Sequence, residues 1–204
     1  MTNARSTNVD SPVYKFGPCR PHGMFLHALR NPCSVGAVAA ASPQLVNAVV
    51  SQVDERSEIV VELGAGTGVI THALLQQRNS RRGVVSIEID PQLAEIVRTR
   101  LSDSEVIVGD ALELASYFGE GQVDCIICSL PLTLLSSRDL HTLLDGARAV
   151  LKEGGRFVFY LYRLGIWRNR YRNVMRCMRD SFPDVSENKT VWRNLPPARV
   201  IVCR

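Results

Sequence analysis

Three acidic residues each follow a short apolar run of the kind that forms a buried strand. They are Glu62, Glu88 and Asp110, the last separated from its run by one glycine. The carboxyl ends of parallel strands meet at one edge of a sheet, so these carboxylates are expected to lie side by side. Carboxylate oxygens accept hydrogen bonds, and such a row could hold a ligand that carries several hydroxyl and amino donors.

A glycine-rich turn directly follows Glu62. Residues 62–68 read ELGAGTG, so three glycines alternate over five positions. Glycine accommodates positive φ and lets the backbone approach a ligand closely. The apolar-periodic segment 69–77 follows, which predicts a strand that turns sharply into a helix around a nucleotide-like cofactor. The turn residues expected to contact this cofactor are Gly64, Ala65, Gly66, Thr67 and Gly68.

The two later acids fit separate parts of a nucleoside. Glu88 stands twenty residues beyond Gly68, and an acid at this interval on the next parallel strand can grip a ribose diol. Asp110 suits an adenine amino group, because a carboxylate accepts the hydrogen bonds that NH₂ donates. The adjacent residues Ile89 and Ala111 are expected to contact the cofactor as well.

The ligand could be a dinucleotide or S-adenosylmethionine. Dinucleotide turns read G-x-G-x-x-G and hold a pyrophosphate at a helix N-terminus, whereas this turn reads G-x-G-x-G after Glu62. An acid in that place repels phosphates but suits a cationic sulfonium and a methionine ammonium. The sequence therefore predicts an S-adenosylmethionine site.

Strands and helices alternate along the chain. The pairs 90–91 and 136–137 supply helix caps, and the glycine pair 154–155 is expected to end the second of these helices. The expected strands cover 60–62, 84–87, 106–108, 123–128, 157–162, 191–192 and 199–203. The last two are expected to form an antiparallel pair. This order predicts an α/β fold with a doubly wound, mostly parallel sheet of seven strands.

The length of 204 residues suits one domain with an extension. Residues 46–204 are expected to form the α/β domain. Residues 13–45 are predicted to be a helical lid or membrane contact, with an amphipathic helix over 22–30, and residues 1–12 a disordered tail. The sequence contains neither an apolar run long enough to span a membrane nor a signal-peptide core at its start, so we expect a cytoplasmic protein.

Six cysteines are scattered along the chain without the spacing of metal ligands. The one C-x-x-C pair, Cys125 and Cys128, lies inside an apolar run. Positions three apart on a strand point to opposite faces, which makes the pair a poor chelate. We predict buried free thiols in a reducing compartment and no metal site.

Charge is unevenly distributed. Residues 163–204 hold ten basic and three acidic residues, a net of +7, whereas residues 61–162 carry a net of −4. Between 163 and 179 there are six arginines and no acid, interleaved with Trp167 and Tyr171. A basic face of this kind favours an anionic partner, either nucleic acid or an anionic membrane surface.

The cofactor motifs resemble those of class I methyltransferases. Three further segments are similar to the bacterial phosphatidylethanolamine N-methyltransferases, or phospholipid N-methyltransferases. They are LRNPCSVGA at 29–37, SLPL at 129–132 and RNLPPARV at 193–200, and the resemblance covers about residues 24–204. It implies a Rossmann-like methyltransferase sheet and N-methylation of phosphatidylethanolamine and its methylated forms, toward phosphatidylcholine.

Within this resemblance, the loop after the fourth strand meets both cofactor and acceptor. Ser129, Leu130 and Pro131 are expected to contact the cofactor, and Ser129 and Tyr162 are the candidates to orient the amine. Methyl transfer to an amine is an in-line displacement that needs neither a nucleophilic side chain nor a metal. Ser42 either contacts the cofactor or caps a helix.

The basic C-terminal part is expected to contact the lipid. Arginine among aromatic residues suits a lipid interface, so the protein is predicted to associate peripherally with the anionic inner face of the cell membrane. The residues predicted to contact the lipid or its phosphate are Arg168, Arg170, Arg172, Arg193, Asn194 and Arg199.

Other functions remain open. The acceptor could be another aminolipid, a small amine or an adenine of ribosomal RNA, and the chain could bind the cofactor without turnover. Ribosomal-RNA adenine dimethylases need an Asn-containing loop that ends in an aromatic residue, which stacks on a flipped adenine. Here the loop begins with Ser129 and ends with Leu132, which favours the lipid amine.

Overall fold

Seven strands form one sheet in the order β3-β2-β1-β4-β5-β7-β6. The computed structural model describes residues 41–77, 83–163 and 168–204. Neighbouring strands pair in parallel from β3 to β5, and β7 runs antiparallel to both β5 and β6. The strands are β1 Ile59–Leu63, β2 Gly83–Glu88, β3 Glu105–Val108, β4 Val123–Cys128, β5 Leu151–Tyr162, β6 Val185–Val191 and β7 Ala198–Cys203. The predicted doubly wound, mostly parallel sheet is confirmed.

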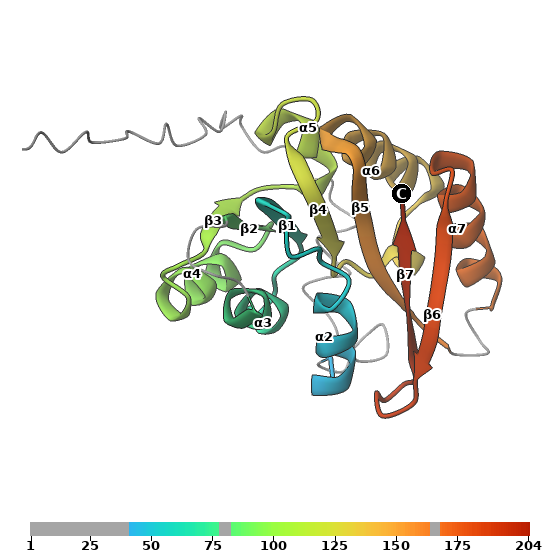
Figure 1. Cartoon of the computed structure of the whole chain (residues 1–204), viewed down its shortest axis with the longest axis horizontal. Helices are drawn as coiled ribbons and strands as arrows, with labels where there is room; N and C mark the ends of the chain where they lie inside the picture. Colours follow the sequence, from blue (N-terminus) through green and yellow to red (C-terminus); the bar gives the residue numbers. More distant parts are fainter. Residues whose placement is uncertain (1–40, 78–82, 164–167) are drawn as a thin grey trace, which may run out of the picture.

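Helices cover both faces of this sheet (Figure 1). One buried cluster packs α5, α6 and α7 against the sheet, and a second packs α2 and α3 against the opposite face. The helices are α2 Pro43–Val50, α3 Val69–Gln77, α4 Pro91–Arg100, α5 Leu114–Tyr117, α6 Ser137–Val150 and α7 Arg168–Ser181, with 3₁₀ turns η2 Ala111–Glu113 and η3 Leu132–Leu134.

Side-chain caps explain where three helices begin. Ser42, Asp90 and Ser136 each accept a hydrogen bond from a backbone N–H in the first turn of α2, α4 and α6. Such caps satisfy amides that have no partner within the helix. A proline follows the cap in α2 and α4, where its fixed φ suits the first turn. Both predicted caps are confirmed, and α3 has the predicted bounds.

Two strand boundaries differ from the prediction. β5 begins at Leu151, because the glycine pair 154–155 forms a bulge within the strand and does not end α6. Gly154 has a φ of 73°, and the register between β4 and β5 shifts at this point. β6 begins at Val185 and not at residue 191. It is an edge strand with polar, partly exposed side chains, so it lacks the apolar run by which buried strands are found.

The predicted tail over 1–12 and most of the extension over 13–45 lie outside the described residues. The predicted boundary at residue 46 falls inside α2, which packs against α3 and β7. Within the ranges that the structure describes, no helix has the length and apolar character needed to cross a membrane.

The prediction that Cys125 and Cys128 are buried free thiols on opposite faces of their strand is confirmed. Cys125 belongs to the cluster beneath α2 and α3, and Cys128 to the cluster beneath α5, α6 and α7. Both are buried free thiols. The pair therefore contributes to two separate halves of the core.

Candidate active site

The carboxyl ends of β1 to β4 meet at one edge of the sheet. Loop amides continue the ladders there: Gly64 donates to the end of β2 at 2.8 Å, and Ser129 donates to the end of β1 at 2.9 Å. The three acids predicted from the sequence lie at these strand ends, and each is at most 5% exposed: Glu62, Glu88 and Asp110. One edge therefore concentrates buried acceptor groups.

Glu62 is a buried carboxylate with two hydroxyl donors. Thr71 of α3 donates to Oε2 at 2.5 Å, and Ser129 donates to Oε1 at 3.1 Å. Burial, helped by the charge of Glu88, raises the pKa of Glu62 from 4.5 to about 8 in spite of these two bonds. A cationic group beside the carboxylate would lower that pKa. Sequence reasoning missed Thr71, whose contact depends on how α3 packs on β1.

Glu88 ends β2 and accepts a hydrogen bond from the glycine-rich turn. Its Oε2 accepts from the amide of Gly66 at 2.8 Å, and its Oε1 accepts from the amide of Asp90 at 3.0 Å. Ile89, between these two acids, is half-buried. The acid predicted to hold a ribose and the turn predicted to border the cofactor are therefore in direct contact.

Asp110 is fully buried where η2 begins. Its Oδ1 accepts from the amide of Leu112 at 2.9 Å, and its own N–H donates to the hydroxyl of Tyr117 at 3.1 Å. A Cβ on Gly109 would collide with that hydroxyl, so glycine is required there. Tyr117 is a positioning residue that the sequence did not indicate, and its neighbour in the loop, Ala111, is also buried.

The three alternating glycines are required for different reasons. All have positive φ, which is 77° at Gly64, 56° at Gly66 and 83° at Gly68. A Cβ on Gly64 would lie 2.5 Å from Leu130, and one on Gly68 would lie 3.1 Å from Leu101. A Cβ on Gly66 would meet no atom within 4 Å. The first and third glycines thus permit close packing of the protein itself, and the second borders open space.

These residues fit S-adenosylmethionine. Glu62 offers a buried carboxylate for a cation, Glu88 adjoins the turn as a ribose acceptor, and Gly66 borders open space. The two residues that flank Gly66 differ in solvent exposure: Ala65 is buried against α4, and Thr67 is exposed. The donors of a methionine ammonium, a ribose and an adenine would all find carboxylates at this edge.

The loop 129–132 contacts Glu62 and the glycine-rich turn. Ser129 bonds Glu62, Leu130 packs on Gly64, and Pro131 precedes η3. Ser129 and Leu130 are therefore held against Glu62 and the glycine-rich turn.

Two tyrosines lie near the end of β5, where Tyr162 was predicted to orient the acceptor. Tyr160 and Tyr162 meet edge to face, with ring centroids 5.7 Å apart. Burial raises the pKa of both hydroxyls, and the charges of Tyr162 and Glu62 raise that of Tyr160 further. Both phenols are therefore neutral near pH 7. The sequence indicated Tyr162 alone, although the two-residue period of a strand puts Tyr160 on the same face.

A cavity of about 520 Å³ opens beside Tyr162, between the end of β5, α7 and the β6–β7 pair. It is lined by Tyr162, Arg163, Arg168, Tyr171, Arg172, Glu187 and Arg199. Its charged side chains carry a net of +3. Glu187 is bound by Arg199 at 2.6 Å and by the hydroxyl of Tyr171 at 3.0 Å. Three of the predicted lipid contacts, on α7 and β7, thus meet in this basic cavity.

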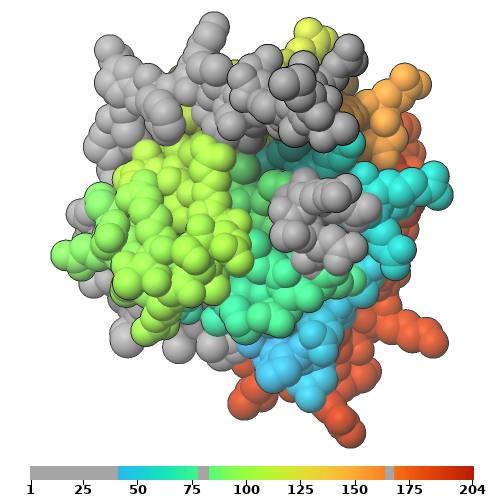
Figure 2. Space-filling view, turned by 60° about the vertical axis from the view of Figure 1, so that its left-hand side comes forward, coloured from blue at the N-terminus to red at the C-terminus, as the bar shows by residue number. Residues whose placement is uncertain are grey.

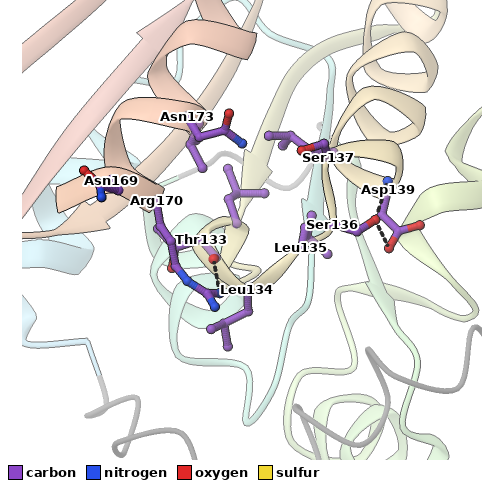
Figure 3. A pocket seen from close by; sticks show the side chains of 12 residues that line it. Thr133, Leu134, Leu135, Ser136, Ser137, Asp139, Asn169, Arg170 and Asn173 are labelled. Carbon is purple, nitrogen blue, oxygen red and sulfur yellow. Dashed lines mark hydrogen bonds between the residues drawn. The ribbon is translucent and has the colours of Figure 1, made fainter. Parts of the chain in front are cut away.

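Two other arginines predicted to contact lipid do not line the basic cavity. Arg170 lines a second cavity of about 610 Å³ between α7 and the start of α6, where it donates to Thr133 O at 2.9 Å (Figure 3). Arg193 is exposed in the loop between β6 and β7. Spacing alone could not separate these positions, because it does not show which side of α7 faces β5.

Asn194 is 2% exposed and makes hydrogen bonds within the protein. Its Oδ1 accepts from the amide of Ser42 at 2.8 Å, and its Nδ2 donates to Pro196 O at 2.7 Å. These bonds tie the β6–β7 loop to the start of α2, and the two segments lie beside each other at the lower edge in Figure 2. The structure therefore gives Asn194 a positioning role in place of lipid contact, and Ser42 serves as the α2 cap.

Comparison with known proteins supports a methyltransferase fold and activity. Residues 60–155 match the family described as "Methyltransferase domain". The chain is 29% identical over 178 residues to the ornithine lipid N-methyltransferase of Singulisphaera acidiphila. The aligned region covers 84% of this chain and 88% of that protein. It is also 34% identical over 73 residues to ribosomal RNA small subunit methyltransferase A of Mycoplasma capricolum. That aligned region covers 34% of this chain and 26% of that protein.

A solved structure shares the fold. A TehB-like methyltransferase from Corynebacterium glutamicum superposes with a TM-score of 0.56 at 16% identity and covers 88% of this chain and 95% of that chain. The fold, the acids at the strand ends and the matched domain define an S-adenosylmethionine-dependent enzyme. The chain is an S-adenosylmethionine-dependent methyltransferase, and its sheet has the Rossmann-like arrangement found in class I methyltransferases.

Proposed function

We propose that this enzyme methylates the amine headgroup of a membrane phospholipid, namely phosphatidylethanolamine and its methylated forms, toward phosphatidylcholine. The observation that carries the proposal is the basic cavity beside Tyr162, which lies where β5 ends. A zwitterionic headgroup has an anion and an amine close together, and it matches a basic cavity beside two tyrosines. The similarity to an ornithine lipid N-methyltransferase supports an aminolipid acceptor.

The arginines of α7 are suited to hold the headgroup anion. Arg168 and Arg172 are four residues apart, so they lie on the same side of the helix, and both are exposed. A guanidinium binds phosphate or carboxylate through two parallel hydrogen bonds. Arg199 is already paired with Glu187, which leaves Arg163 and the two α7 arginines to contact the anion.

Bound S-adenosylmethionine would supply an electrophilic methyl group, so the protein chiefly orients the amine and excludes water. The amine must present its lone pair and therefore lose its proton. The hydroxyl oxygens of Tyr162 and Ser129 can accept a hydrogen bond from the ammonium and direct its proton toward water. As methyl groups accumulate and N–H donors are lost, the tyrosine rings can face the growing cation.

The test is methyl transfer from labelled S-adenosylmethionine to four acceptors offered separately. These are phosphatidylethanolamine vesicles, ornithine lipid vesicles, small amines and ribosomal RNA. Label in phosphatidylethanolamine is the expected result. Label only in ornithine lipid would retain the aminolipid chemistry but replace the phosphate by a carboxylate. Label only in RNA would overturn the proposal.

A pair of variants tests the anion contact. The double variant Arg168→Gln/Arg172→Gln should raise KM for the lipid by roughly tenfold or more, because each lost charge-assisted hydrogen bond is worth about 1.5–3 kcal/mol in protein. The affinity for S-adenosylmethionine should stay unchanged. Arg138→Gln/Arg148→Gln removes the same charge from exposed positions of α6 and serves as the control. Equal effects in the two double variants would contradict a specific contact.

A further inference from the structure

The loop between β6 and β7 displays two large apolar side chains. Trp192 is 72% exposed and Leu195 is 83% exposed. The other exposed large apolar residues in the described ranges are Val69 and Val108, at 45% and 38%. An indole ring has an apolar body and a polar N–H, and tryptophan is enriched where proteins meet the boundary between water and lipid.

The loop holds these side chains outward on an ordered support. Asn194, between them, is buried and bonded to the start of α2. The amide of Arg163 donates to Pro197 O at 2.7 Å, which fastens the end of the loop to the end of β5. A buried asparagine beside the exposed side chains of Trp192 and Leu195 is the reverse of what is expected for a loop that faces water alone.

The surroundings of the loop are basic. Arg193 is exposed within it, and Arg163 and Arg168 line the adjoining cavity. Tyr162 pairs with Ala198, the first residue of β7, so the loop ends beside the acceptor side of the site. Apolar side chains bordered by arginines match an anionic phospholipid surface, where guanidinium groups meet phosphates and apolar groups meet the acyl boundary.

We infer that residues 192–197 form a membrane anchor. Trp192 and Leu195 enter the headgroup region of an anionic phospholipid bilayer, and this brings the basic cavity and Tyr162 against the lipid surface. The inference deepens the proposed function and rests on it for the identity of the substrate. Anchoring itself is measured without methyl transfer, so the two can fail separately.

Tryptophan fluorescence tests where the loop lies. The chain has two tryptophans, and Trp167→Phe leaves Trp192 as the single reporter. Vesicles of phosphatidylglycerol and phosphatidylethanolamine should shift its emission to shorter wavelength, and brominated acyl chains should quench it. Vesicles of phosphatidylcholine alone should have a weaker effect. Emission that stays unchanged while the protein floats with anionic vesicles would overturn the inference.

Flotation of variants tests whether the two side chains anchor the protein. Trp192→Ser/Leu195→Ser should weaken binding to the anionic vesicles by roughly tenfold or more. Val108→Ser is the control, because it removes an exposed apolar side chain from β3, at the opposite edge of the sheet. An equal loss in both variants, or none in either, would refute the anchor.

Two further measurements separate this inference from its alternatives. Sedimentation should show the same oligomeric state with and without the double substitution, and loss of self-association without loss of vesicle binding would assign the loop to a second copy. The Trp192→Ser/Leu195→Ser variant should still methylate a short-chain aminolipid in free solution. Vesicle binding without methylation of phosphatidylethanolamine would leave the anchor standing and refute the proposed substrate.

Discussion

Glu62 carries a proton near neutral pH that a bound cation would displace. Burial raises its pKa to about 8, and the methionine ammonium of S-adenosylmethionine would lower it. Binding of the cofactor is therefore coupled to proton release. The affinity should rise with pH until it approaches the pKa of Glu62 in the empty protein.

Calorimetry in buffers of different ionisation enthalpy should detect this coupling. Between pH 6 and 7, wild-type protein is expected to release close to one proton for each S-adenosylmethionine bound. Glu62→Gln should release none and bind more weakly by about 1–3 kcal/mol, the usual loss for a hydrogen bond to a charged group. Equal proton release by the two proteins would show that Glu62 does not meet the cation.

The same pKa contributes to the pH dependence of stability in the empty protein. The folded state keeps a proton on Glu62 that the unfolded chain loses near its ordinary pKa of 4.5. The contribution to stability is therefore complete below that value and is lost as pH rises to about 8. The free energy of unfolding, measured with urea, should decrease less between pH 5 and pH 8 for Glu62→Gln than for wild type.

Asp110 is expected to hold the adenine and also to cap η2. Asp110→Ala should weaken S-adenosylmethionine binding by about 1–3 kcal/mol and also lower stability, since both contacts are lost. Asp110→Asn keeps an acceptor for the cap, so it should lose cofactor affinity with little change in Tm. Unchanged cofactor dissociation constants in both variants would place the adenine elsewhere.

At the scale of the element, the glycine-rich turn combines packing with binding. Gly64→Ala should lower the free energy of unfolding more than Gly66→Ala, because only the first adds a clash with Leu130 to the cost of positive φ, about 1–2 kcal/mol. Gly66→Ala should fold and lose cofactor affinity by roughly tenfold, because its methyl group enters the open space. Unfolding curves and cofactor titrations measure the two effects, and full affinity in Gly66→Ala would remove the cofactor from that space.

Local patterns predicted the elements that carry the cofactor site. The acids at the ends of β1, β2 and β3, the turn at 62–68 and the cap at Asp90 are encoded within short segments. Contacts between distant segments were not predictable, since spacing does not show which elements adjoin. The bond between Asn194 and Ser42 and the packing of Leu130 on Gly64 belong to this class. β6 was missed over most of its length because an edge strand can be polar.

At the scale of the whole molecule, the charge is segregated. The segment 61–162, which holds the acids of the cofactor site, has a net of −4, and the segment 163–204 has a net of +7. Because the two charges are separated, an anionic surface would attract the basic segment and so orient the protein. This orientation would present β7, α7 and the basic cavity to the membrane.

Binding to anionic vesicles should therefore depend on where charge is removed. Arg168→Gln/Arg172→Gln/Arg176→Gln should weaken flotation by up to about 100-fold, since a basic residue near an anionic membrane contributes about 1 kcal/mol. Arg100→Gln/Arg138→Gln/Arg148→Gln makes the same change in net charge at exposed positions of α4 and α6 and should have little effect. Added salt should weaken wild-type binding, and insensitivity to both salt and position would argue against an electrostatic membrane contact.

The packing of Leu130 on Gly64 limits how this enzyme could acquire a new acceptor. The loop predicted to meet the acceptor and the turn predicted to border the methyl donor are in direct contact, in which a single added carbon already collides. Exchanging the loop for one from an enzyme of different specificity would disturb donor affinity unless the leucine volume were preserved. Specificity can diverge more freely across the wall formed by α7 and β7, where side chains can change without displacing the donor.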